Sequence, residues 1–274
     1  MRWLAGTALL VLAVATSAAT ARQDGPPERD MTGAATHQVV LAAEDDAAPW
    51  SYADGSGFVN DLVLAAFREA GWSVQLSVMP YARCKALALH GDIAGCFTTS
   101  HAPGLDAGLM FPAEPVIDPR HVIVARNGTH WQGCDPARWG ARPLVGTVRG
   151  YEYVPEADAL FSRDAARADV SDSEITNLRK LRAGRIDLAL VVLDDVKRLD
   201  YLARLAAVPP DFRTVCDLGP LPGYVAFSRR HPQGAAALAA FDAGMARLKR
   251  RGGLAPLVAA WRTRALDAAA AKVH

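Results

Sequence analysis

Residues 58–99 read FVNDLVLAAFREAGWSVQLSVMPYARCKALALHGDIAGCFTT, and this stretch decides the fold. Apolar residues recur with helical spacing over 58–71 and over 81–91, and each of these segments ends in a glycine. Short apolar runs that predict strands precede, separate and follow the two helices, at 37–43, 72–79 and 92–99. The alternation of strands and helices predicts a parallel sheet with right-handed crossovers.

A second α/β unit follows the first. Its predicted strands are 120–128, 143–148, 168–172 and 185–192, and its predicted helices are 155–165, 174–184 and 194–205. Two units of similar size predict two lobes. The closing segment, residues 224–266, has too little sheet to form a lobe of its own, so we expect it to return to the first lobe. The expected division is lobe 1 at 37–123 and 225–266, lobe 2 at 124–224 and a tail at 267–274, with hinge strands near 122–125 and 224–227.

The first 21 residues have the pattern of a secretory signal peptide. Arg2 gives a basic start, a short apolar stretch follows, and Ala19 and Ala21 fit the small-residue rule for cleavage. The apolar stretch is well short of the ~20 residues that a transmembrane helix needs. We therefore expect a signal peptide at 1–21, a disordered leader at 22–36, and a mature protein in the periplasm.

The composition argues against several classes of function. Of the 274 residues, 51% are hydrophobic and 22% are charged, which is typical of a globular chain with a sizeable core. The formal net charge is +1, and loss of Arg2 with the signal peptide takes it to 0. Nucleic acid is therefore not an expected partner, since no basic excess is present. The histidine spacing predicts no metal site, and no phosphate-binding loop or other cofactor motif occurs.

Four cysteines in an exported chain predict disulfides. None of them forms a C-x-x-C pair, so a zinc or redox site is not expected. Cys84 lies in the first turn of a helix that starts at the carboxyl edge of the sheet, and Cys96 lies toward the end of the next strand. Their heights along the sheet are comparable. This favours a bridge from Cys84 to Cys96 and leaves Cys134 with Cys216. Four free buried thiols are the alternative.

Five segments in order, GFVNDLVLAAFREAG, PYARCKALALHGDI, CFTTS, LVGTVRG and LRAGRIDLAL, resemble family 3 of the bacterial extracellular solute-binding proteins. These are the polar-amino-acid type that serves ABC importers, and the resemblance covers 37–264. It implies an α/β, two-lobed periplasmic binding protein fold of type II, in which each lobe is a mixed, mainly parallel sheet with flanking helices. It also implies a monomer that closes around a small solute, performs no catalysis, and serves an ABC permease or a membrane sensor.

The resemblance also implies positions for the binding site in the first lobe. An acid, aromatic rings and hydroxyl groups are expected at Glu44, Trp50, Tyr52, Tyr81, Thr98 and Ser100. The arginine that clamps the ligand carboxylate in this family is missing, and Leu105 stands at about its position. Because a buried carboxylate needs a charged partner, Arg83 or Arg149 is the candidate replacement. A role at the surface is the alternative for each of these arginines.

In the second lobe the turn after the strand VGTVRG usually carries small hydroxyl residues, and here it carries Tyr151, Glu152 and Tyr153. Such large rings indicate a smaller ligand, or one with a flat or apolar face, although packing is the alternative. The acid that binds an α-ammonium group is expected at Asp194 or Asp195. Each of these is equally suited to cap a helix.

Two other functions remain open at this point. Some members of this fold are periplasmic lyases, and Glu44, Glu152 and Arg83 at a cleft would suit acid–base catalysis. The bulky tyrosines and the lost arginine also suit an accessory protein of a periplasmic redox system with a degenerate cleft.

Overall fold

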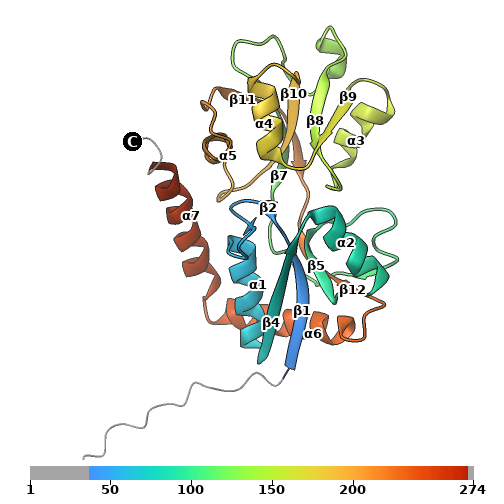
Figure 1. Ribbon diagram of the computed structural model, residues 1–274, viewed down its shortest axis with the longest axis vertical. Coiled ribbons are helices and arrows are strands. Elements are labelled where there is room, and N and C mark those ends of the chain that lie inside the picture. The colour runs from blue at the N-terminus through green and yellow to red at the C-terminus, as the bar shows by residue number, and fades with distance from the viewer. Residues whose placement is uncertain (1–36, 271–274) are drawn as a thin grey trace, which may run out of the picture. The chain divides into compact units, whose positions relative to one another are not determined.

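The computed structural model describes residues 37–270, so the expected signal peptide and leader lie outside the described residues. The chain forms two five-stranded mixed sheets, each flanked by helices (Figure 1). Helices between residues 37 and 270 are all too short or too polar to cross a membrane.

The first sheet takes strands from both ends of the described chain. Its order is β4 (Trp72–Met79), β1 (His37–Glu44), β5 (Gly95–Thr99), β12 (Tyr224–Ser228) and β6 (Leu109–Met110). Its helices are α1 (Phe58–Glu69), α2 (Tyr81–His90), α6 (Gly234–Arg250) and α7 (Leu254–Ala270). β1 is parallel to β4 and β5, because α1 and α2 carry the chain back between these strands. β12 is antiparallel to β5 and β6, so the closing segment does return to the first sheet.

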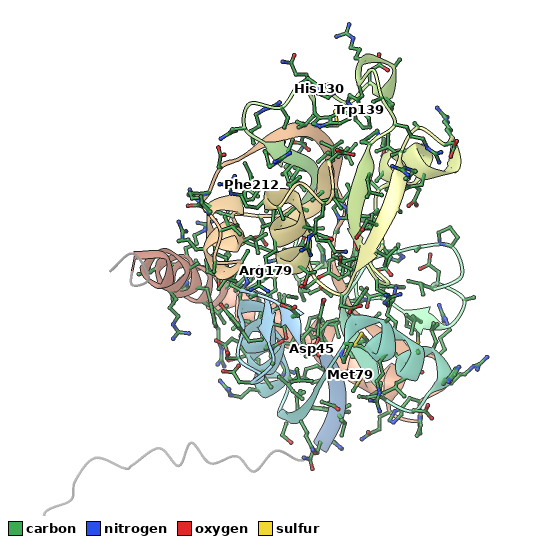
Figure 2. The ribbon with its side chains drawn as sticks, turned by 45° about the horizontal axis from the view of Figure 1, so that its top comes forward. Asp45, Met79, His130, Trp139, Arg179 and Phe212 are labelled. Atoms are coloured by element: carbon green, nitrogen blue, oxygen red, sulfur yellow. A yellow bond between two sulfur atoms is a disulfide. The ribbon has the colours of Figure 1, made fainter. Side chains whose placement is uncertain are left out.

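Alternating side chains of β1 bury the two faces of this sheet. Leu41 and Ala43 belong to the apolar cluster that contains α1 and α6, whereas Ala42 belongs to the cluster that contains α2. This period of two is what a strand covered on both faces requires. Both layers of helices therefore hold the carboxyl edge of the sheet in place. At that edge the Asp45 amide donates to the Met79 carbonyl at 3.2 Å, and Figure 2 shows the two residues side by side.

The second sheet is built from the middle of the chain. Its order is β11 (Phe212–Pro220), β7 (Arg120–Arg126), β10 (Leu188–Leu193), β8 (Leu144–Val148) and β9 (Arg167–Ser171). Its helices are α3 (Pro155–Ser162), α4 (Glu174–Arg182) and α5 (Leu199–Leu205), with a short 3-10 helix, η1 (Pro136–Arg138). β8, β9 and β10 are parallel, and β7 is antiparallel to both of its neighbours. We call the two sheets with their helices the first and second lobes.

Several sequence-based boundaries differ from the structure. β7 lies wholly in the second sheet, so the hinge expected at 122–125 and the domain boundary expected after 123 both fall inside one strand. The chain instead passes between the sheets on either side of a bridge between Ile117 and Gly223. α7 continues into the expected tail, to Ala270.

Two disulfides are present, Cys84–Cys96 and Cys134–Cys216, which are the pairs that the sequence favours. The first joins α2 to β5. The second joins the loop before η1 to β11, next to the cluster that contains the buried Trp139 (Figure 2).

Candidate functional site

A cavity of about 30 Å³ lies where residues of the two lobes meet. Its polar and aromatic lining comes from Glu44, Trp50, Tyr81, Thr98 and Ser100 of the first lobe and from His121, Tyr151 and Glu152 of the second. Glu44, at the end of β1, and Thr98, near the end of β5, place the cavity at the carboxyl ends of parallel strands, where ligands of α/β sheets bind.

The loop that carries Trp50 is fixed by side chains on both sides. The Ser51 hydroxyl donates to the Glu44 carbonyl at 2.5 Å. The Asn60 amide, from the first turn of α1, donates to the Ser51 hydroxyl and to the Gly55 carbonyl, each at 3.0 Å. Both side chains that make these bonds, Ser51 and Asn60, are buried, so the indole of Trp50 is held at the cavity by a rigid frame.

Glu44 is a buried carboxyl group in the cavity wall. The Tyr151 hydroxyl of the second lobe donates to its Oε1 at 2.9 Å. Burial raises the pKa of Glu44 to about 8, against the smaller opposing effects of Tyr151 and the positive charge of Lys197. Burial, with the charge of Glu44, also raises the pKa of Tyr151 well above its usual value, so this phenol remains a donor.

Trp50 connects the cavity to a buried ion pair of the second lobe. Its Nε1 donates to Asp194 at 2.7 Å, and the Lys197 ammonium lies 4.0 Å from the centroid of its ring. Lys197 is fully buried and pairs with Glu174. Because this ammonium has both a carboxylate and an aromatic face beside it, a buried positive charge is tolerated directly behind the cavity wall.

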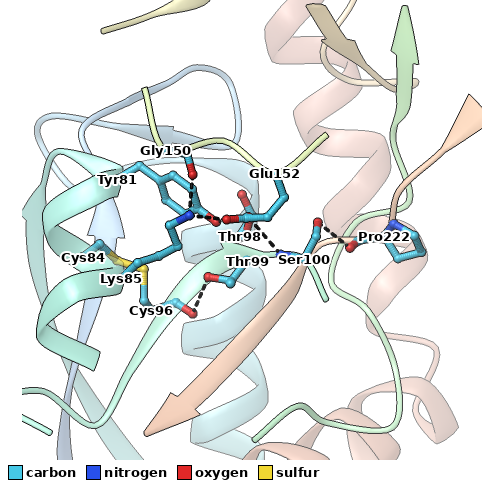
Figure 3. A network of polar contacts seen from close by, with 10 residues as sticks. All are labelled: Tyr81, Cys84, Lys85, Cys96, Thr98, Thr99, Ser100, Gly150, Glu152 and Pro222. Atoms are coloured by element: carbon cyan, nitrogen blue, oxygen red, sulfur yellow. Dashed lines mark hydrogen bonds and ion pairs between the residues drawn. A yellow bond between two sulfur atoms is a disulfide. The ribbon is translucent and has the colours of Figure 1, made fainter. Parts of the chain in front are cut away.

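Glu152 crosses from the second lobe to the first. The Tyr81 hydroxyl donates to Glu152 Oε2 at 2.5 Å, and the backbone amide of Ser100 donates to the same oxygen at 3.4 Å. Lys85 forms an ion pair with Oε1 of this carboxylate and also donates to the Gly150 carbonyl. Figure 3 shows this network, with the Cys84–Cys96 disulfide beside it. Burial and the charge of Glu152 raise the pKa of Tyr81 well above its usual value.

His121 adds a polar group whose hydrogen-bonding capacity is unused. Its side chain is 3% exposed, and within the described chain its Nδ1 has no hydrogen-bond partner. Burial, reinforced by the charge of Lys197, lowers the pKa of His121 to about 4, so the ring is neutral at neutral pH. In residues 37–270 no three His, Cys, Asp or Glu side chains gather closely enough to hold a metal ion.

Three of the residues selected from the sequence in the first lobe and at the end of β8, Tyr52, Arg83 and Arg149, do not line this cavity. Tyr52 shares a 2.5 Å hydrogen bond with the Tyr201 hydroxyl and stacks on Trp261. Arg83 is exposed on α2, and Arg149 is exposed and pairs with Asp172 at 3.1 Å. Neither arginine lines this cavity.

Asp194 and Asp195 have structural partners. Asp194 accepts bonds from the backbone amides of Val196 and Lys197 at 2.7 and 2.6 Å, as well as the bond from Trp50. Asp195 pairs with Arg262 of α7. Asp194 thus caps a turn, while α5 itself begins later than the sequence predicts, at Leu199.

Lys85 and His121 are site residues that the sequence reasoning missed. Lys85 lies two residues after Arg83 and four residues after Tyr81, so it shares the Tyr81 face of α2. Helical spacing from Tyr81 was therefore the signal that distinguishes Lys85 from Arg83. His121 has no comparable motif, because it lies inside the predicted strand 120–128.

Known structures share this fold. A histidine kinase sensor domain with similarity to periplasmic binding proteins matches with a TM-score of 0.70 and 19% identity, over 82% of this chain and 95% of that one. An ancestral arginine-binding protein bound to arginine matches with a TM-score of 0.69 and 15% identity, over 82% and 97%. An amino acid ABC transporter substrate-binding protein from Streptococcus pneumoniae, bound to L-arginine, gives 0.66 and 17%, over 83% and 95%.

At these identities the likeness establishes architecture and leaves the solute open. No protein-family model matches the chain, and no curated protein matches it in sequence. The strand orders of both sheets and the cavity between the lobes agree with the architecture that the sequence predicts. The chain therefore has the two-lobed fold of periplasmic binding proteins, the fold implied by its resemblance to family 3 of the solute-binding proteins.

Proposed function

We propose that this protein binds a small polar solute between its lobes in the periplasm and delivers it to an ABC importer or reports it to a membrane sensor. The observation that carries the proposal is the cavity lined from both lobes by hydrogen-bonding and aromatic groups. His121 supports it, because a buried Nδ1 without a partner is costly unless a bound molecule completes its bonding.

Contacts across the lobes support closure as the signal. Tyr151 bonds to Glu44, Trp50 to Asp194, and Tyr52 to Tyr201, at 2.5 to 2.9 Å. These bonds form only when the lobes meet, so closure creates a surface composed of both lobes for a permease or sensor to recognise. The sensor role has a precedent of the same fold in the histidine kinase sensor domain.

A ligand screen tests the proposal. The mature chain is mixed with single amino acids, carboxylates, amines and sugars, and its melting temperature is measured. A solute present about 100-fold above its Kd is expected to raise the melting temperature by about 5 to 10 °C. The absence of any stabilising solute would overturn the proposal, and chemical conversion of the bound solute would replace it with the lyase alternative.

Thr98→Val separates binding in the cavity from binding elsewhere. Thr98 lines the cavity, and valine keeps its shape while removing the hydroxyl. The affinity for the solute found in the screen, measured by calorimetry, is expected to fall about tenfold. Thr263→Val, at an exposed position on α7, is the matched control and should leave the affinity unchanged. Equal affinities for both variants would place the solute outside this cavity.

A further inference from the structure

The carboxylate of Glu152 is held in the first lobe as a bound anion would be. Tyr81 and the Ser100 amide donate to one of its oxygens, and the Lys85 ammonium pairs with the other. Three donors from two elements of one lobe thus converge on a single carboxylate that belongs to the other lobe (Figure 3). Such convergence on an anion is the arrangement by which proteins bind carboxylates.

The donor set is built into the first lobe. Tyr81 and Lys85 lie one turn apart on α2, so both face the end of β5, where Ser100 follows. The Cys84–Cys96 disulfide joins α2 to β5 beside these donors. The Ser100 hydroxyl donates to the Pro222 carbonyl at 2.8 Å, which leaves its backbone amide to face Glu152. The covalent cross-link therefore ties the helix that carries Tyr81 and Lys85 to the strand that leads to Ser100.

The site is also shielded from water. The Lys85 and Glu152 side chains are 14% and 8% exposed, so their charges are attracted in a medium of reduced dielectric constant. Lys85 also lies 4.7 Å from the centroid of the Tyr81 ring. Arg83 and Arg149 do not line the cavity, whereas Lys85 pairs with Glu152, which does.

We propose that Tyr81, Lys85 and the Ser100 amide form the carboxylate-binding site of this protein, and that Glu152 occupies it as an internal ligand. The inference rests on the proposed function, and it names the solute class as a small carboxylate that displaces Glu152. Displacement is required because the Glu152 carboxylate already accepts the bonds of Tyr81, Lys85 and the Ser100 amide that a bound carboxylate would need.

Glu152 reaches the site because its own segment comes very close to α2. A Cβ atom on Gly150 would lie 3.1 Å from the Cβ of Ala82, and Gly150 has a φ of +81°. A glycine at this position permits both the approach and the turn. When the solute displaces Glu152, this segment leaves α2. The internal carboxylate therefore raises the solute concentration that is needed to fill the site. The apparent affinity equals the intrinsic affinity multiplied by the fraction of molecules in which Glu152 has left the site.

Glu152→Gln tests the inference. Glu156→Gln, at an exposed position of α3, is the matched control. Succinate is the probe, and uncharged succinamide controls for the carboxylate, with binding to the mature chain measured by calorimetry. We expect Glu152→Gln to bind succinate about tenfold more tightly than the wild-type chain or Glu156→Gln, since the competing charge is removed. Adding Lys85→Gln to Glu152→Gln should abolish this gain, whereas adding Arg250→Gln at an exposed position of α6 should preserve it. Circular dichroism confirms that each variant is folded.

The outcomes separate this inference from the proposed function. If Glu152→Gln binds succinate no more tightly than Glu156→Gln, the inference is overturned, even where the wild-type chain binds another solute in the screen. If the gain also persists without Lys85, the donor set is overturned. If Glu152→Gln gains succinate affinity through Lys85 while the wild-type chain binds no solute, the carboxylate site is supported and the transport function fails.

Discussion

Glu44 and His121 line one cavity, and burial raises the pKa of Glu44 while it lowers the pKa of His121. The folded-state pKa of Glu44, about 8, exceeds its unfolded value of 4.5, so its stabilising effect is full below pH 4.5 and is lost as the pH rises through 8. The folded-state pKa of His121, about 4, is below its unfolded value of 6.5, so its effect is full above pH 6.5 and is lost as the pH falls through 4. Of these two groups, Glu44 is therefore the one whose effect on stability changes between pH 6.5 and 8.

The free energy of unfolding is therefore expected to fall between pH 6.5 and 8, with a limiting slope of about 1.4 kcal/mol per pH unit. Urea unfolding at several pH values measures it. Glu44→Gln, which stays uncharged at every pH, should flatten this part of the profile, and Glu156→Gln at an exposed position should not. A Glu44→Gln profile as steep as that of the wild-type chain would show that another group titrates here.

Sequence reasoning was most useful for residues whose position depends on strand ends. Glu44, Thr98 and Ser100 were implied by the resemblance to family 3; they lie at the carboxyl edge of the sheet, and all three line the cavity. Charged residues were harder to place, because the rotation of a helix decides which of two neighbouring cations faces inward. Arg83 is exposed and Lys85 reaches Glu152, a difference that becomes visible only when the partner carboxylate is in place.

Helices and strands with regular apolar spacing were predicted well, and β11 was missed for a physical reason. Its sequence, FRTVCDLGP, contains Asp217, Gly219 and Pro220, which disfavour a strand. The structure accommodates them by shifting register twice against β7, between Thr214 and Cys216 and between Asp217 and Gly219. Pairing with a long, buried neighbour thus overrides local propensity, and a single sequence does not show that neighbour.

Where α6 crosses α1, close packing predicts a loss of stability at a position where helix propensity alone predicts a gain. Gly244 lies inside α6, and a Cβ atom there would stand 1.8 Å from the carbonyl oxygen of Ala66 in α1. Propensity favours Gly244→Ala by about 1 kcal/mol. We expect the clash to dominate and to lower the free energy of unfolding by about 1 to 3 kcal/mol, measured in urea. Ala246→Ser, on the exposed face of α6, should change it by less than about 0.5 kcal/mol, and a more stable Gly244→Ala chain would contradict the close packing.

The two disulfides constrain the whole chain to different extents. Cys84–Cys96 closes a loop of 12 residues in sequence separation, and Cys134–Cys216 closes one of 82. Loop-closure entropy predicts losses of about 3 and about 4.5 kcal/mol when they are removed, because the longer loop restricts the unfolded chain more. The shorter bridge, however, is the one that lies beside the donors around Glu152 (Figure 3).

Removing each bridge by a pair of alanines should therefore affect stability and binding in opposite orders. Cys134→Ala with Cys216→Ala is expected to cause the larger loss in urea unfolding and to leave succinate affinity, measured in the Glu152→Gln background, unchanged. Cys84→Ala with Cys96→Ala is expected to cause the smaller loss of stability and to weaken succinate binding about tenfold, since α2 and β5 are no longer cross-linked. Each pair serves as the control for the other. Equal succinate affinities in the two alanine pairs would show that packing of α2 on the sheet suffices to hold Tyr81 and Lys85 opposite Ser100.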